Sequence, residues 1–231
     1  MRILSSTAVV VSLVLSASLG AAQTPAAQAP AAQPAATDIY LVQFAKALPG
    51  QAATLEKNLK EQDPKDPMAS HYILLRHQEG ADWDYCLIQH LGPKAAVEIT
   101  PLPAAAPGAA PVGAWHEDTY VAGPSWAEFQ KTMDVAGTGN SVYVVAVHRQ
   151  APGHRVQLQE MLSRSEPGEK VAGRTLMAHL QGGAWTFLSL NRYASWQDLG
   201  ADRASVASGK GWLESRQHSS FHTDTIADRV R

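Results

Sequence analysis

The chain has 231 residues, a formal net charge of -2 at neutral pH and 17% charged residues. No basic cluster has a pattern that would track a phosphate backbone, so we expect no nucleic-acid partner. The one cysteine, Cys86, excludes an intramolecular disulfide, and its position in an apolar run favours a buried structural thiol.

The first 22 residues have the pattern of a secretory signal peptide. Arg2 supplies an early positive charge, residues 8–15 form an apolar run, and small residues lead to Ala22. The run is shorter than the roughly 18 to 20 apolar residues that span a bilayer. We therefore expect cleavage near Ala22, a mature chain without a membrane span, and a secreted or periplasmic location.

Residues 23–37 consist almost entirely of alanine, proline and glutamine, which predicts a disordered linker. The chain that follows, residues 38–231, is long enough for one domain of ordinary size or for two small ones.

Two segments, residues 40–59 and 143–162, share one pattern at a constant offset. In each, a β-rich run ends at a Pro-Gly pair, and the apolar period then changes from two to about 3.6. This pattern predicts a strand, a turn and an amphipathic helix. The positions that are identical in the two segments are Tyr40 and Tyr143, Val42 and Val145, Pro49 and Pro152, Gly50 and Gly153, Leu55 and Leu158, and Leu59 and Leu162.

Two later pairs of segments follow in the same order. Residues 77–88 and 179–190 each have apolar runs on both sides of a glycine-bearing turn, which predicts a β-hairpin. Residues 116–119, "HEDT", and residues 222–225, "HTDT", then predict the last strand of each copy.

The connections before these last strands differ between the copies. The second copy has room for one or two helices there, with Ser195 as N-cap, whereas repeated prolines forbid a long helix in the first copy. We predict a first repeat at residues 38–124, a connecting helix and linker at 125–140, and a second repeat at 141–231.

The predicted fold class is α+β, with two tandem ferredoxin-like β-α-β-β-α-β repeats whose antiparallel sheets form one barrel. This plan resembles the dimeric α/β barrel superfamily in a single-chain form, and is similar to NIPSNAP-like and antibiotic-biosynthesis-monooxygenase-like proteins. The superfamily also includes haem-binding chlorite-dismutase-like proteins. The resemblance implies a small-molecule site and allows an oxygenase-type activity without a cofactor.

The two His-x-Asp pairs are candidate site residues, because alternate residues of a strand lie on one face. If both pairs face the barrel interior, His116, Asp118, His222 and Asp224 converge on one cavity and could bind a ligand, shuttle protons or bind a metal. The alternative is a pair of hydrogen-bonded structural devices at strand ends, in which the adjoining threonines satisfy backbone groups.

The hairpins supply further candidates. His77 and His179 precede the turns, and Trp83 and Trp185 follow them. Each histidine is either a satisfied core residue or a site residue, and each tryptophan is either a core anchor or a wall of a ligand pocket. Two basic residues at the ends of the first strands, Lys46 and Arg149, would bind an anionic ligand at the barrel mouth or remain solvated.

The sequence lacks a G-x-S-x-G elbow, an H-E-x-x-H motif, a Walker loop, a paired C-x-x-C and a dinucleotide fingerprint. We therefore expect an exported barrel, monomeric or homodimeric, that binds a small, partly apolar ligand and needs no cofactor or metal.

In the enzymatic version, His179, or His222 with Asp224, removes a proton from the substrate. His77, Trp83, His116, Asp118 and Trp185 contact it. The alternatives are a non-catalytic envelope protein with a packed barrel that acts through a protein partner, and a metal-binding protein that uses the histidine and aspartate pairs.

Overall fold

The computed structural model describes residues 38–61, 68–98, 111–166, 168–206 and 211–230, so the predicted signal peptide and linker lie outside the described residues. The strands are β1 (Asp38–Ala47), β2 (Tyr72–Glu79), β3 (Tyr85–Pro93), β4 (Gly113–Gly123), β5 (Val142–Gln150), β6 (Gly173–Gln181), β7 (Phe187–Tyr193) and β8 (Ser219–Arg229). The helices are α1 (Ala52–Lys60), α2 (Trp126–Thr132), α3 (Arg155–Ser163), α4 (Trp196–Val206) and α5 (Gly211–His218).

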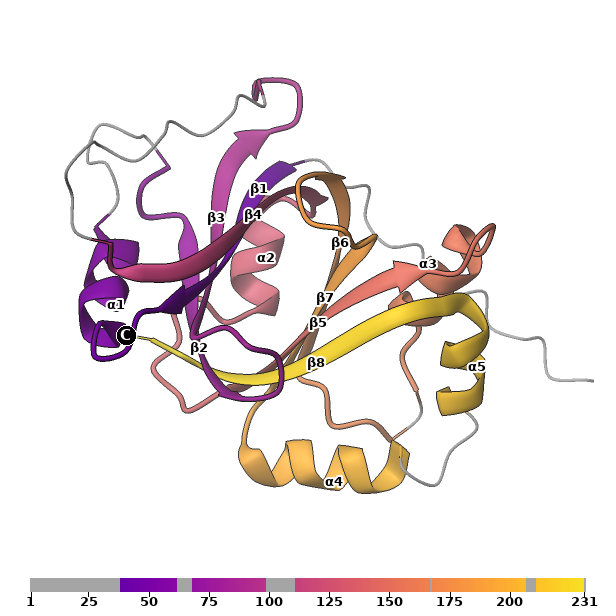
Figure 1. Ribbon diagram of the computed structural model, residues 1–231. Coiled ribbons are helices and arrows are strands. Elements are labelled where there is room, and N and C mark those ends of the chain that lie inside the picture. Colours follow the sequence, from indigo (N-terminus) through magenta and orange to yellow (C-terminus); the bar gives the residue numbers. More distant parts are fainter. Residues whose placement is uncertain (1–37, 62–67, 99–110, 167, 207–210, 231) are drawn as a thin grey trace, which may run out of the picture.

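The eight strands form one antiparallel sheet, which closes in the order β1-β3-β2-β8-β5-β7-β6-β4 (Figure 1). The predicted α+β class is therefore confirmed. The closure is uneven: β1 pairs with β4 over Asp38–Ala47, whereas β4 contacts β6 only from Tyr120 to Ala122 and β2 contacts β8 only from Leu75 to Glu79. The strand order runs β4-β1-β3-β2 in the half before α2 and β8-β5-β7-β6 in the half after it.

Local sequence signals explain the paired strand–helix units. β1 leads through Pro49 and Gly50 into α1, and β5 leads through Pro152 and Gly153 into α3. Gly50 and Gly153 have φ values of 79° and 81°, a left-handed conformation that glycine adopts with little strain. The second half has α4 and α5 between β7 and β8, and the Ser195 hydroxyl accepts a hydrogen bond from the Asp198 amide at the start of α4.

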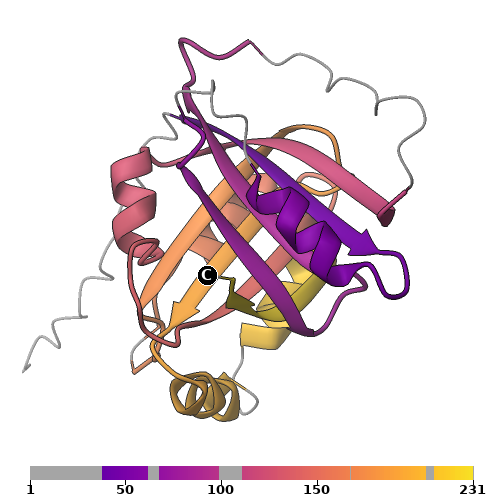
Figure 2. The same ribbon diagram turned by 90° about the vertical axis from the view of Figure 1, so that its left-hand side faces the viewer.

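The barrel interior holds the largest apolar cluster, to which alternate residues of the strands contribute. It includes Tyr40 and Val42 of β1, Tyr143 and Val145 of β5, and Met177 of β6. The opposite residues of the strands face outward and pack against α1, α3 and α4, whereas Phe129 of α2 belongs to the interior cluster. Figure 2 shows α1 lying against the outside of the sheet, where its leucines join a separate apolar cluster.

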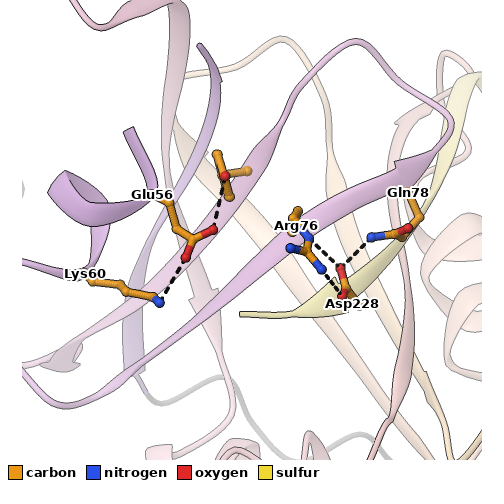
Figure 3. Close-up of polar contacts among 6 residues, drawn as sticks. Glu56, Lys60, Arg76, Gln78 and Asp228 are labelled. Atoms are coloured by element: carbon orange, nitrogen blue, oxygen red, sulfur yellow. Dashed lines mark hydrogen bonds and ion pairs between the residues drawn. The ribbon is translucent and has the colours of Figure 1, made fainter. Parts of the chain in front are cut away.

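One of the two seams between the halves carries a polar network, which Figure 3 shows. The Arg76 guanidinium of β2 donates to both carboxylate oxygens of Asp228 on β8, at 3.3 and 2.7 Å, and the Gln78 amide donates to the same carboxylate at 2.7 Å. Nearby, the Glu56 carboxylate of α1 accepts a hydrogen bond from Lys60. The Arg76 and Gln78 contacts with Asp228 cross the short β2–β8 ladder, and because they are exposed they contribute little to stability.

Candidate functional site

A cavity of about 320 Å³ lies inside the barrel, at the level where β1 and β5 end and β4 and β8 begin. Both halves supply its walls. The aromatic walls are Phe44, Trp83, Trp115, Trp185 and Phe221. The volume falls within the range of pockets that hold small organic molecules. The interior is thus not filled completely by side chains, although a packed core lies beneath the cavity.

The aromatic walls differ in exposure. Trp83 and Trp185 are 5% and 7% exposed, whereas Trp115 and Phe221 are 39% and 42% exposed. Trp83 packs against Phe44 with ring centroids 5.5 Å apart. The two exposed rings therefore lie at the mouth of the cavity, and the two buried tryptophans lie further in. Walls of this kind favour a flat, largely apolar ligand, because aromatic rings stack on such a surface.

Two charged side chains line the cavity, Glu117 of β4 and Arg149 of β5. Glu117 Oε1 accepts a hydrogen bond of 3.0 Å from the Trp185 indole nitrogen. Arg149 Nε donates to the backbone oxygen of Ala184 at 2.6 Å, and its guanidinium lies 5.4 Å from the centre of the Phe221 ring. These contacts orient a half-buried carboxylate and an exposed guanidinium on the aromatic wall of the cavity.

The hairpin histidines share the strand phase of Leu75 and Met177, which belong to the interior cluster. His77 meets Trp83 edge-on with ring centroids 5.6 Å apart, and His179 meets Trp185 in the same way, also at 5.6 Å. The Nε2 atoms of both histidines are buried and lack a hydrogen-bond partner among the described residues. Trp83 and Trp185 line the cavity, whereas the two histidines lie behind them.

The two His-x-Asp pairs lie on the outer face of the barrel, opposite the cavity. The residues of β4 and β8 that line the cavity are the alternate ones, including Glu117 and Thr223. His116 is exposed, and its Nε2 lies 3.3 Å from Asp118, which also accepts a hydrogen bond of 2.8 Å from Gln43. His222 instead stacks on the buried His148 with ring centroids 6.1 Å apart. The four residues therefore do not converge on one interior cavity.

The threonines that end the segments HEDT and HTDT, Thr119 and Thr225, each form a hydrogen bond with the hairpin of the opposite half. Thr225 Oγ1 of β8 accepts a hydrogen bond of 3.1 Å from the Ala81 amide in the turn between β2 and β3. Thr119 Oγ1 of β4 accepts one of 2.9 Å from the Gly183 amide in the turn between β6 and β7. The threonines thus do satisfy backbone groups, as the structural alternative required, but across the two halves and not beside the adjoining histidine and aspartate.

Sequence reasoning missed Glu117 as a site residue and gave Arg149 only as an anion contact at the barrel mouth. The available signal was the alternation along β4 and β8. The phase that contains Trp115, Glu117 and Thr119 continues into the buried Val121, so it is the interior phase.

Within the described residues, no group of three or more histidine, cysteine, aspartate or glutamate side chains is placed to hold a metal ion. Over the same part of the chain, none of the helices combines the length and the hydropathy needed to cross a bilayer.

Comparisons with known proteins identify the fold only. No family model matches the sequence, and a search of curated proteins finds no match. Among solved structures, one described as an anthrone oxidase-like protein matches with a TM-score of 0.51, and the match covers 84% of this chain and 92% of that chain. The two sequences are 10% identical, so this likeness supports an α+β barrel and says nothing of activity.

Proposed function

We propose that this protein binds a small, flat aromatic molecule inside its barrel. The observation that carries the proposal is the interior cavity, which has aromatic walls from both halves and two charged side chains, Glu117 and Arg149, on those walls. Aromatic walls give apolar area and stacking, and a few fixed polar groups give orientation. The tethered, exported barrel of the sequence prediction is the setting of this proposal.

We further propose that the two halves are tandem ferredoxin-like repeats and that the activity is an oxygenase-type one. Two features support the repeats: the strand order within each half, and the two threonine contacts that hold the opposite hairpins. The name of the similar structure suggests the substrate type, a ring ketone with an acidic CH₂ group. For such a substrate the overall change is R₂CH₂ + O₂ → R₂C=O + H₂O.

The geometry suggests roles for the charged residues in that reaction. Glu117 is the group that would accept the proton from the ring CH₂, and the Arg149 guanidinium would stabilise the negative charge that forms on the ketone oxygen. Trp83 and Trp185 would hold the ring by stacking. The proton acceptor is therefore moved from His179 and His222 to Glu117, because His222 faces away from the cavity and His179 lies behind Trp185.

Binding is tested first, with anthraquinone as a flat probe and quenching of tryptophan fluorescence as the measurement. Trp185→Ala should weaken binding at least about tenfold, because it removes an interior wall of the cavity. Trp196→Ala is the matched control, since Trp196 is 53% exposed on α4, away from the cavity. Equal affinity of both variants, or no binding by the parent protein, would contradict the proposed site.

Activity is tested separately, as oxygen uptake with anthrone above the rate in buffer alone. Glu117→Gln should lower the rate by about 100-fold or more if the carboxylate is the base. Asp118→Asn is the control, because the neighbouring side chain lies on the outer face of the same strand. Normal anthraquinone binding without any oxygen uptake would retain the binding proposal and reject the oxygenase one.

A further inference from the structure

A second cavity, of about 440 Å³, lies on the outer face of the second half, where β5, β7 and β8 pass near α3 and α4. Polar residues of the sheet, His148, Ser189 and Asp224, form part of its lining. Apolar residues, among them Val144, Ala146 and Leu162, form another part. This outer cavity is distinct from the aromatic cavity inside the barrel, because alternate residues of one strand face opposite sides of a sheet.

The ladder registers allow the two halves to be compared position by position. Gln43 pairs with Leu87 on one side and with Asp118 on the other, and Ala146 pairs with Ser189 and with Asp224 in the same arrangement. Two residues further along each first strand lie Ala45 and His148.

In the first half, the polar side chains of the corresponding outer surface form a hydrogen bond with each other. Gln43 Nε2 donates a hydrogen bond of 2.8 Å to Asp118. Ala45 and Leu87 belong to the apolar cluster that covers the sheet with the leucines of α1. The carboxylate has a partner and the neighbouring surface is apolar, so the first half has no corresponding polar site.

In the second half, the aspartate is kept as Asp224, but the three positions around it have changed. Ala146 has no amide to donate, and the Asp224 side chain makes no hydrogen bond within the described ranges. A polar pair replaces the apolar one: His148 Nε2 lies 2.9 Å from Ser189 Oγ, and the two residues are 8% and 5% exposed. Burial of such a pair costs free energy that the first half avoids with Ala45 and Leu87, so the fold itself does not require it.

His222, which is adjacent to the residues that line the cavity, has a buried atom without a partner among the described residues. Its ring stacks on His148 with an interplanar angle of 12°, and its buried Nδ1 has no hydrogen-bond partner in the described part of the chain. A native structure seldom leaves a buried polar atom unpaired without a reason, such as a bound molecule.

The charges around the outer cavity favour a cation. Its lining has four carboxylates, on Glu166, Glu169, Asp202 and Asp224, and two guanidiniums, on Arg174 and Arg203. Glu169 is bound by Arg174 at 2.8 Å and Asp202 by the hydroxyl of a tyrosine at 2.8 Å. Asp224 is thus the carboxylate of the sheet that remains available to a ligand.

We propose that the outer cavity binds a small primary ammonium ion that carries a short alkyl chain. Asp224 accepts hydrogen bonds from the ammonium group, His148 and Ser189 supply neutral polar contacts beside it, and the alkyl chain lies against Val144, Ala146 and Leu162. A charge-assisted hydrogen bond of this kind is about twice as strong as a neutral one, and the apolar wall supplies the rest of the affinity.

The probes are n-butylammonium, n-butanol and butyrate, which share one chain and differ in charge. They contain no aromatic ring, so the aromatic cavity offers them no stacking surface. Binding is measured by calorimetry and by the NMR signals of the histidine imidazoles. Butylammonium should bind at least about tenfold more tightly than either other probe, and should shift the signals of His148 and His222 more than those of His77 and His179.

Two substitutions and one matched control assign the site. Asp224→Asn removes the carboxylate charge, and Ala146→Gln supplies the amide that Gln43 gives to Asp118; each should weaken butylammonium binding at least about tenfold. Asp118→Asn should leave it unchanged, because that carboxylate lies in the first half. Circular dichroism and thermal unfolding confirm that each variant is folded.

Three results would overturn this proposal: no preference for the ammonium probe, equal effects of Asp118→Asn and Asp224→Asn, or undiminished binding by Ala146→Gln. The outcome is independent of the aromatic cavity, since Trp185→Ala should leave butylammonium binding intact.

Discussion

Buried His148 should make the free energy of unfolding depend on pH between about 4 and 6.5. The residue is 8% exposed, and burial lowers its pKa from 6.5 to about 4. The charge of Asp224 opposes this shift, and the neighbouring His222 adds to it. The folded protein therefore keeps the imidazole neutral at pH values where the unfolded chain protonates it.

The sign and the size of the change in the free energy of unfolding follow from the difference in the His148 pKa between the folded and unfolded states. Between about pH 4 and 6.5 the unfolded state binds more protons, so stability from His148 is complete above pH 6.5 and is lost as the pH falls towards 4. A shift from 6.5 to about 4 corresponds to roughly 3 kcal/mol at about 1.4 kcal/mol per pKa unit.

The assay is urea unfolding at pH 7 and at pH 4, with the double variant His148→Ala/Ser189→Leu as comparison. This variant copies Ala45 and Leu87 of the first half. His90, whose pKa is also lowered by burial, is present in both proteins, so the difference between their pH dependences isolates His148. The parent protein should lose roughly 3 kcal/mol more than the variant; equal losses would refute the reasoning.

Two further predictions concern the contacts between the halves, and both are measured by urea unfolding. Gly182→Ala should destabilise by more than about 2 kcal/mol, because Gly182 has a φ of 119° and an added Cβ would lie 2.3 Å from the backbone oxygen of Asp118. Gly153→Ala, at a φ of 81° with open space around it, should cost about 1 kcal/mol, and equal costs would contradict the close approach. Thr119→Val should cost about 1 to 3 kcal/mol because it leaves a hairpin amide unpaired, whereas Thr119→Ser should cost clearly less; no difference between them would reject the hydroxyl as acceptor.

The fold could be predicted as far as local patterns determine it. A change of apolar period after each Pro-Gly pair is a property of neighbouring residues, so the strand–helix units at Pro49 and Pro152 were readable from the sequence. The uneven closure was not readable, because ladder length at the seams depends on contacts between residues far apart in the chain, such as Arg76 with Asp228.

The candidate site was predicted only in part, because the sequence did not determine which face of β4 and β8 points into the barrel. Trp83 and Trp185 line the interior cavity as the pocket hypothesis required. The His-x-Asp pairs lie on the other face of the sheet, so Glu117 and not His222 is the acid–base group that lines the cavity. The sequence of β4 has apolar residues in both phases, such as Tyr120 and Val121, and the burial of Thr119 and Val121 in the structure identifies the interior one.

The comparison of the halves separates structural from chemical residues. Thr119 and Thr225 make the same contact in opposite directions, so their recurrence has a structural cause that needs no ligand. Glu117 differs from its counterpart in the second half. Glu117 of β4 pairs with Phe44 of β1, and at the matching position Thr223 of β8 pairs with Val147 of β5. The matching positions thus hold a carboxylate in one half and a hydroxyl in the other, so this carboxylate is not part of the contact that the two halves share. The same reasoning applies on the outer face, where the first half has Ala45 at the position of the buried His148.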